Sequence, residues 1–440
     1  MKNILIIGAG RSAVSLIKYL LDYASENNCF ITVADVSLEL AKESIINYNN
    51  CLALSFNVKD KKQREEQISH ADIVVSMLPA FMHIDVARDC VRLGKHLVTA
   101  SYVSESMLDL DKEARNSGVI LLNEVGLDPG LDHMSAMKII DEIKNKGGDI
   151  TSFKSFCGGL VHPDYDNNPW NYKFTWNPRN VVLAGKGIAQ YINKGKLKCI
   201  PYHKLFERID IINFLDLGEF EAYPNRDSLS YRKSYGLENI STLLRGTLRK
   251  RGFCNSWNLF VQLGMTDDSY TIKECNSMSY RDFTNLFLNY SDKLSVEDKF
   301  CKYLSIDKNS DNFKKIDWLG LFSDNKIIIK NGTPAEILQA ILEQKWSLDP
   351  GDKDMIIMKH EFEFIIKGEK KKLSSSLMVS GDNSKYTAMA KTVGIPVAIA
   401  TKRILDGTIN SSGVQIPTHK NIYVPVLDEL KNYGINFIEE

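Results

Sequence analysis

The chain lacks the features that mark membrane, nucleic-acid-binding and disulfide-stabilised proteins. No apolar run approaches the ~20 residues that a membrane-spanning helix needs. Lys plus Arg and Asp plus Glu both number 55 among the 440 residues, so the formal net charge is zero. Without a long basic block, nothing favours nucleic acid or an anionic membrane surface as a partner. We therefore expect a soluble protein without a nucleic-acid or membrane partner.

Paired cysteines are also missing. The eight cysteines are scattered and none forms a Cys-x-x-Cys pair, which favours the reducing cytoplasm over disulfides or a zinc site. Asp128, Asp132 and His133 are bunched on one turn without a spaced fourth ligand, so no metal site is predicted. The N-terminal MKNILIIGAG has an apolar run of only about five residues and no cleavage site after it, so we predict a strand rather than a signal peptide.

A dinucleotide fingerprint is present at the N-terminus. ILIIGAGRSAVSLIKYLL predicts a buried parallel strand, a glycine turn and an amphipathic helix. In the GxGxxA turn, Gly8 makes the tight bend, Gly10 lets the backbone approach a pyrophosphate, and Ala13 lets the helix pack closely. A second strand, FITVAD, ends at Asp35. A carboxylate there binds the ribose 2′-OH and repels a 2′-phosphate, so the sequence predicts a Rossmann domain that favours NAD over NADP.

Further strand patterns follow in CLALSFNV, ADIVVSMLP and HLVTASYV. Because the carboxyl ends of parallel strands line the cofactor crevice, we expect Leu78, Pro79, Ser101 and Tyr102 near the nicotinamide. His83, which follows soon after, is expected to be structural rather than catalytic.

The stretch NEVGLDPGLDHM follows one more predicted strand, GVILL. Asp-Pro-Gly is typical of a turn, which places Asp128 at the same sheet edge as the cofactor. The apolar spacing after it predicts a helix from Met134 to Gly147, with Asp132 as its N-cap and His133 in a structural role.

The chain changes character near residue 150. ITSFKSFCGGL, PWNYKFTWNP and LGEFEAYPNRDSL predict strands of an antiparallel sheet over a cleft. ENISTLLRGTLRKRGFCNSWNLFVQLG and TPAEILQAILEQKW predict helices, and two strands flank the KGEK turn. SKYTAMAKTVGIPVAIATKRILDG predicts a long helix rich in small residues that packs on the N-terminal sheet.

Several polar residues in this half have two interpretations. Arg226 lies in a turn after a strand, while Arg245 and Arg249 would share one face of a helix. Each could form a surface ion pair or bind an anion. Cys157 has no adjoining His and is more often a buried small residue than a nucleophile. The residues alone leave these alternatives open.

Many segments together resemble the L-glutamate-forming saccharopine dehydrogenases, also called saccharopine reductases. These are GAGRSA, SMLP, VTASYVS, NEVGLDPGLDHM, FCGGL, YKFTW, EAYPNRDS and LLRGTLR, followed by YTAMAKTVGIPVAIA and GVQIPTHKNIYVPVLDEL. The resemblance implies an α/β protein in three parts. A Rossmann dinucleotide-binding domain (1–130) is completed by about 385–440. An α/β substrate-binding domain (131–235 and about 350–384) carries a mostly helical insertion (236–349).

The resemblance also implies a reaction: interconversion of saccharopine with L-glutamate and 2-aminoadipate 6-semialdehyde by hydride transfer to or from a nicotinamide. Saccharopine carries three carboxylates, and guanidinium groups suit carboxylates well. The implied substrate-binding residues are Ser101, Tyr102, Asp128, Arg226, Thr247, Leu248 and Arg249. Asp128 is expected to hold the charged secondary amine and place water, with Tyr102 and Cys157 as its catalytic neighbours.

The cofactor positions form a larger set. The expected residues are Gly8, Ala9, Gly10, Arg11, Ser12, Ala13, Asp35, Val36, Asn57, Val58, Leu78, Pro79, Ala100, Ser101, Leu127, Asp128, Pro129 and Trp176. Fungal members that use NADP have Cys-Arg where this chain has Asp35 and Val36, which again favours NAD and leaves NADP as the alternative.

Two other functions fit the pattern less well. A carboxynorspermidine dehydrogenase-like imine reductase would need fewer cations than YPNRDS and LRGTLR supply. A non-catalytic NAD-binding protein would not need Asp128 and Tyr102. We expect a homodimer, while the physiological direction of the reaction does not follow from the sequence.

Overall fold

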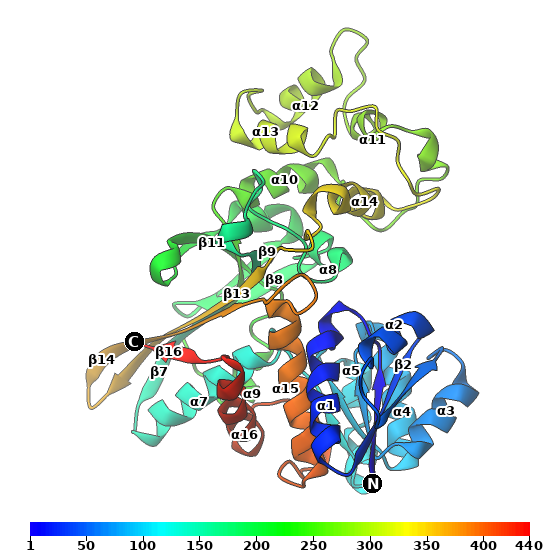
Figure 1. Ribbon diagram of the computed structural model, residues 1–440. Helices are drawn as coiled ribbons and strands as arrows, with labels where there is room; N and C mark the ends of the chain where they lie inside the picture. Colours follow the sequence, from blue (N-terminus) through cyan, green and yellow to red (C-terminus); the bar gives the residue numbers. More distant parts are fainter. The chain divides into compact units, whose positions relative to one another are not determined.

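The computed structural model describes residues 1–440, which form two compact units (Figure 1). The first unit comprises Met1–Ile150, Phe364–Lys371 and Leu377–Glu440. The second comprises Thr151–Glu363 and Lys372–Ser376. Residues 131–150 group with the first unit, where the helix α7 (Leu131–Asn145) packs on α16 (Lys420–Leu430). The three-part division predicted from the sequence is finer than these two units and stays a prediction.

The first unit is built on a parallel sheet with the strand order β15-β6-β5-β4-β1-β2-β3. The strands are β1 (Lys2–Ile7), β2 (Cys29–Asp35), β3 (Cys51–Ser55), β4 (Ile73–Ser76), β5 (His96–Thr99), β6 (Ile120–Leu122) and β15 (Gly413–Gln415). The order reverses between β1 and β4, and this is the place where open α/β sheets bind ligands at their carboxyl edge. The predicted Rossmann fold is confirmed.

Helices connect these strands and bury the sheet. They include α1 (Val14–Glu26), α2 (Leu38–Ser44), α3 (Lys61–His70), α4 (His83–Leu93), α5 (Glu105–Leu108) and α6 (Asp111–Asn116). No helix in either unit is both long and apolar enough to cross a membrane.

The predicted small-residue helix is α15 (Ala388–Leu405), which lies along α1 and also contacts β4 and β5 (Figure 1). A Cβ added at Gly394 would stand 2.9 Å from the backbone nitrogen of Leu16. Close helix packing therefore requires glycine there, and a segment far along the chain completes the nucleotide-binding unit.

The second sheet of the chain, most of which lies in the second unit, is mixed rather than antiparallel as predicted. Its strand order is β10-β11-β12-β7-β13-β14-β16, where β16 comprises Phe437–Glu439, and the β8–β9 hairpin pairs with β12. The strands are β7 (Asp149–Val161), β8 (Ile188–Asn193), β9 (Lys196–Pro201), β10 (Asp210–Asn213), β11 (Glu219–Pro224), β12 (Thr242–Lys250), β13 (Asp354–Ile366) and β14 (Glu369–Ser380). β12 pairs with β11 antiparallel and with β7 parallel.

Two secondary-structure predictions for this unit were wrong. Residues 242–250 form the strand β12, and only Phe253–Leu263 forms a helix, α10. β12 is buried on both faces, so its apolar spacing resembles that of a buried helix. The segment PWNYKFTWNP is not a strand: a single bridge joins Phe174 to Ser347, and α8 (Pro178–Val182) begins within it.

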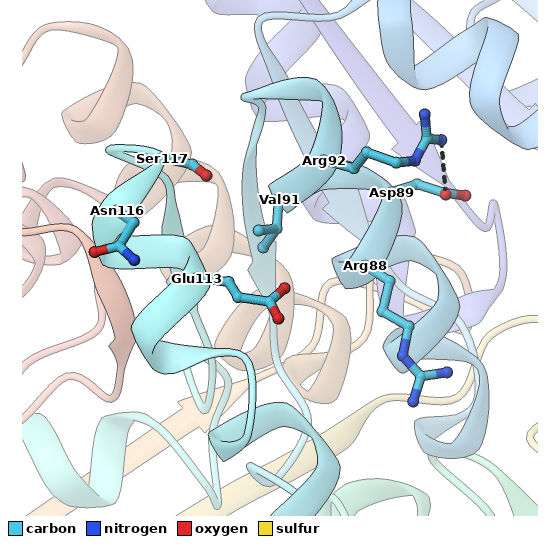
Figure 2. A pocket seen from close by; sticks show the side chains of 7 residues that line it. All are labelled: Arg88, Asp89, Val91, Arg92, Glu113, Asn116 and Ser117. Atoms are coloured by element: carbon cyan, nitrogen blue, oxygen red, sulfur yellow. Dashed lines mark hydrogen bonds and ion pairs between the residues drawn. The ribbon is translucent and has the colours of Figure 1, made fainter.

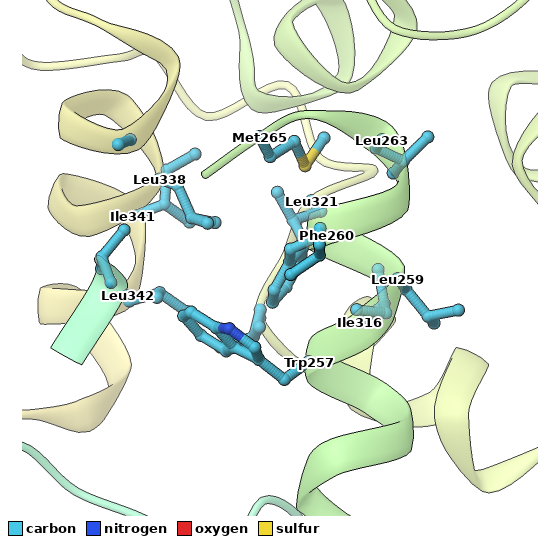
Figure 3. Packing of buried hydrophobic residues seen from close by; sticks show 14 of the residues in the cluster. Trp257, Leu259, Phe260, Leu263, Met265, Ile316, Leu321, Leu338, Ile341 and Leu342 are labelled. Carbon is cyan, nitrogen blue, oxygen red and sulfur yellow. The ribbon is translucent and has the colours of Figure 1, made fainter. Parts of the chain in front are cut away.

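Several helices form the rest of the second unit. They are α9 (Tyr231–Ser234), α11 (Tyr280–Asn285), α12 (Val296–Leu304), α13 (Asp311–Trp318) and the predicted α14 (Pro334–Trp346). Trp257 and Phe260 of α10 pack toward Leu342 of α14 in one buried cluster (Figure 3). This aromatic core lies beneath α10 and fixes the helices onto the sheet.

Candidate active site

The glycine turn has the conformation that the fingerprint requires. Gly8 has a φ of +106°, and a Cβ there would stand 3.0 Å from the carbonyl oxygen of Met77. A Cβ at Gly10 would meet nothing within 4 Å, so the turn is open on the side where a pyrophosphate would approach. Residues 11–13 form a short helical turn that leads into α1. Their backbone amides lie where a dinucleotide phosphate binds.

Asp35 ties the end of β2 to this turn. One oxygen of its carboxylate accepts a hydrogen bond from the amide of Ala9 at 2.7 Å, and the other accepts one from the amide of Ser37 at 2.9 Å. A carboxylate has about four acceptor positions, so two are left for ribose hydroxyls. Val36 beside it is 78% exposed. The turn and Asp35 thus fit an adenosine ribose.

The other predicted cofactor residues of this unit lie on the same edge. Asn57 and Val58 follow β3, Leu78 and Pro79 follow β4, and Ala100 follows β5. In a parallel sheet these ends share one edge. Leu127 and Pro129 are buried, while Asp128 between them is half-buried.

Three strand-tip hydroxyls surround His83, the first residue of α4. Its Nδ1 lies 2.8 Å from Ser76 Oγ, and its Nε2 lies 2.7 Å from Ser101 Oγ and 3.2 Å from Thr99 Oγ1. Burial lowers the pKa of His83 to about 4, so the ring is neutral at pH 7. Sequence reasoning treated His83 as structural and missed its contact with Ser101. Its place just after the tip of β4 was the available signal.

The loop after β6 brings two predicted catalytic residues together. The hydroxyl of Tyr102 donates to Asp128 Oδ1 at 3.0 Å. The loop is closed by hydrogen bonds from the Gly126 amide to the Pro129 carbonyl and from the Leu131 amide to the Gly126 carbonyl, both 2.9 Å. The Asp128–Pro129 peptide is cis. The turn predicted for this stretch is present and holds Asp128 beside Tyr102.

The predicted helix cap was wrong. α7 begins at Leu131, with Gly130 as its N-cap, three residues before the predicted start. Asp132 lies inside the first turn, and its Oδ1 accepts a hydrogen bond from the amide of Gly130 at 2.6 Å. Gly130 has a φ of +147°, so the chain bends there and enters the helix early.

In the second unit, β12 carries the predicted substrate residues on opposite faces. Thr247 is in register with Tyr223 on β11 and with Cys157 on β7, so these three share one face with Arg249. Leu248 faces the other way and is fully buried in a core cluster, so its side chain does not reach that face. Cys157 is buried, with 7% of its surface exposed.

Arg249 is a buried guanidinium without an acidic partner. It is 4% exposed, and its carbon Cζ lies 5.1, 5.4 and 5.8 Å from the ring centres of Tyr172, Phe253 and Tyr223. One Nη donates to the carbonyl of Leu248 at 2.9 Å, and Nε has no hydrogen-bond partner.

The acid opposite Arg249 is already engaged. Glu221, its cross-strand neighbour, accepts hydrogen bonds from the amides of Gly252 and Cys254 at 2.7 and 2.8 Å. A buried cation without a counter-charge is costly. The arrangement suits an anionic group brought by a ligand.

The remaining predicted residues of this unit differ in how deeply they are buried. Arg245 is buried, with its guanidinium 4.5 Å from the ring centre of Tyr231. It shares a face with Arg249 because both lie on a strand rather than on the predicted helix. Arg226 is exposed, in a turn with a φ of +49°. Trp176 is half-buried against the aromatic core.

The first unit also contains a polar pocket. Arg88, Arg92, Glu113, Asn116 and Ser117 line it between α4 and α6, and Arg92 pairs with Asp89 at 3.0 Å (Figure 2). It involves the C-terminal half of α4, which runs away from the carboxyl edge of the sheet. None of the predicted site residues contributes to it.

Comparisons with known proteins cover the whole chain. The family model described as "Saccharopine dehydrogenase NADP binding domain" matches residues 4–122, and the one described as "Saccharopine dehydrogenase C-terminal domain" matches residues 126–435. A saccharopine dehydrogenase [NADP(+), L-glutamate-forming] of Schizosaccharomyces pombe is 36% identical over 450 residues, covering 100% of this chain and 99% of the relative.

Two further relatives show how the match extends. The mitochondrial alpha-aminoadipic semialdehyde synthase of Mus musculus is 33% identical over 99% of this chain, which spans 47% of that longer protein. The solved apo structure of the L-Glu-forming saccharopine dehydrogenase of Saccharomyces cerevisiae is 32% identical, with a TM-score of 0.89 over 100% of this chain and 99% of that one.

Proposed function

Because this chain belongs to the saccharopine dehydrogenase family, we propose that it interconverts saccharopine with L-glutamate and 2-aminoadipate 6-semialdehyde, a step of lysine metabolism. The proposal rests on relatives that match the full length of the chain at about one-third identity and are named for this activity. A nicotinamide cofactor supplies the hydride chemistry when bound, so the chain's own residues must bind, orient and manage protons.

The observation that carries the proposal is the hydrogen bond between Tyr102 and Asp128 at the carboxyl edge of the Rossmann sheet. We assign Asp128 to the bridging nitrogen of saccharopine, where a carboxylate would stabilise the charged amine and position the hydrolytic water. Tyr102 would hold Asp128 in orientation through its phenol. Cys157 of the second unit is proposed as a further catalytic residue.

The substrate carboxylates account for the cations of the second unit. Arg249 is proposed to bind one of them, because its guanidinium is buried among aromatic rings without an acidic partner. Arg226, Thr247 and Ser101 are proposed as further ligands. Leu248 would take part through its backbone, since its side chain belongs to the core.

We propose NAD as the preferred cofactor. The carboxylate of Asp35 is held at the end of β2 by Ala9 and Ser37, and its negative charge would oppose a 2′-phosphate. The fungal relatives are named for NADP(+), and the family model for the first domain is also named for NADP, so the two cofactors must be compared directly. The cofactor residues of the glycine turn and strand tips, and Trp176, are proposed as predicted. A cytoplasmic location and a homodimer also stay predictions.

The test is an initial-rate assay with NADH and with NADPH, using 2-aminoadipate 6-semialdehyde with and without L-glutamate, and saccharopine in the reverse direction. We expect oxidation of the reduced cofactor that depends on L-glutamate, with a kcat/KM for NADH above that for NADPH. Asp128→Asn should lower kcat by about 10²-fold or more while the Kd for NADH stays unchanged. Equal use of NADPH would refute the cofactor preference alone. Cofactor binding without turnover would refute the proposed function. It would favour an imine reductase that acts on another substrate, or a non-catalytic NAD-binding protein.

A further inference from the structure

Three ionisable side chains are buried in the loop that carries Asp128 and in the first turn of α7. Glu124, Asp132 and His133 are each at most 1% exposed. His133 Nε2 lies 2.9 Å from Glu124 Oε2, and its Nδ1 lies 3.6 Å from Asp132 Oδ2. The imidazole thus stands between two carboxylates, one in close hydrogen-bond contact and one slightly farther away.

The two ends of this network hold backbone next to the predicted catalytic residues. Glu124 Oε1 accepts from the amide of Val103 at 2.9 Å, and Asp132 Oδ1 accepts from the amide of Gly130 at 2.6 Å. Val103 directly follows Tyr102, and Gly130 comes two residues after Asp128. The network therefore binds both of the chain segments that carry the hydrogen-bonded pair, Tyr102 and Asp128.

The backbone of Glu124 is itself held in an unfavourable region. Its φ is +59°, a left-handed conformation that costs a residue with a side chain some free energy and needs surrounding contacts to persist. Burying two carboxylates and an imidazole is costly as well, and an apolar side chain would fill the same core without that cost. Both observations suggest a role beyond packing.

We propose that Glu124, His133 and Asp132 form a positioning network that fixes the geometry of Tyr102 relative to Asp128. As positioning residues, the three act through the Val103 and Gly130 amides. The catalytic consequence rests on the proposed function, but the mechanical coupling of these two amides does not.

The first test compares Glu124→Ala with Glu124→Gln in the saccharopine assay. The Ala variant removes both hydrogen bonds and should lower kcat about 10- to 100-fold, because small misplacements of catalytic groups cost rate steeply. The Gln variant can still accept from Val103 and donate to a ring nitrogen of His133, and it should keep kcat within about threefold. The Kd for NADH should stay unchanged in both.

Two controls separate positioning from stability. Ile140→Ala makes a cavity farther along α7, where Ile140 is fully buried, and should lower the Tm but leave kcat unchanged. In an Asp128→Asn background, Glu124→Ala should cost little further rate, since residues that act as a unit are not additive. The proposal is overturned if Glu124→Ala lowers kcat by the same factor in the wild type and in Asp128→Asn. It is also overturned if Glu124→Ala alone keeps the wild-type kcat.

Hydrogen exchange gives a readout independent of turnover. The Val103 and Gly130 amides should be protected in the wild type and should exchange faster together in Glu124→Ala but not in Ile140→Ala. If Glu124→Ala does not fold, His133→Gln is measured in the same way, with faster exchange at both amides expected and unchanged exchange overturning the network. If the wild type is inactive but the Val103 and Gly130 amides still exchange faster together in Glu124→Ala, the proposed function is refuted and the network is supported.

Discussion

Two buried arginines, Arg64 and Arg249, differ in whether an acidic side chain neutralises their charge. Arg64 is 7% exposed and pairs with Asp89 at 2.6 Å, so its charge is neutralised inside the first unit. Arg249 is similarly buried but faces aromatic rings and a backbone carbonyl. A guanidinium in the second situation has no acid to neutralise it, which is why we propose a substrate carboxylate as its partner, whereas one in the first is structural.

This contrast yields a prediction for two matched variants. Arg249→Met should raise the KM for saccharopine at least about 10-fold and leave the free energy of unfolding equal or higher, because it removes an uncompensated buried charge. Arg64→Met leaves the buried Asp89 with the half-exposed Arg92 as its remaining partner and should lower the free energy of unfolding by about 1.5–3 kcal/mol. Steady-state kinetics and urea denaturation measure the two effects. A wild-type KM in Arg249→Met would remove Arg249 from the substrate site.

At the scale of elements, the loop between β6 and α7 depends on one close approach. A Cβ at Gly130 would stand 2.1 Å from the carbonyl oxygen of Gly126, which is far inside a contact distance. The same loop carries Asp128 and leads directly into α7. Its shape therefore controls both the start of a helix and the position of a proposed catalytic carboxylate.

We expect Gly130→Ala to disrupt this loop. The variant should lose about 3 kcal/mol or more of unfolding free energy or rearrange the loop with a large loss of kcat, because the backbone has no room to yield. Gly94→Ala is the control: Gly94 also has a positive φ, +67°, but a Cβ there meets nothing within 4 Å. That change should cost only about 1–2 kcal/mol and no activity. Equal thermal stability of the two variants, together with a wild-type kcat in Gly130→Ala, would contradict the argument.

At the scale of the whole molecule, the first unit is assembled from distant parts of the chain. Glu429 on α16 receives hydrogen bonds from Lys402 at 2.8 Å and Arg403 at 2.9 Å on α15, and also from Tyr19 on α1. This cluster links the two C-terminal helices α15 and α16 to the first helix, α1. Burial opposes the charge of Glu429, but Lys402 and Tyr19 hydrogen bonds and the charges of Lys402 and Arg403 lower its pKa.

The sign of this shift makes a prediction about pH. A carboxylate with a lowered pKa in the folded state stabilises the protein above its unfolded-state pKa and loses that effect as the pH falls through the folded-state pKa. Glu429→Gln should therefore cost about 1–3 kcal/mol of unfolding free energy at pH 7 and progressively less in the acidic range below the ordinary pKa of a glutamate.

Its control is Asp428→Asn, which removes an exposed pair with Lys431, the residue directly after α16, and should change stability by no more than about 1 kcal/mol. Urea denaturation across pH measures both. A loss in Glu429→Gln that is independent of pH would contradict an ionic contribution from this cluster.

The sequence by itself determined those features whose signal is local. The nucleotide-binding turn was predicted from Gly8, Gly10 and Asp35, because such a turn needs glycine at set positions and a carboxylate at the end of the next strand. The parallel strands were recognisable as short apolar runs, and α15 by its small residues. The resemblance to a family then singled out Asp128 and Tyr102.

Tertiary structure alone decided the rest, because burial and partners depend on residues far apart in the chain. β12 could not be told from a helix until its two neighbouring strands were known, since a strand buried on both faces has no alternation. The unpaired charge of Arg249 follows from Glu221 being engaged by α10. The contacts of His83 and the network around His133 likewise exist only where strand tips and loops converge.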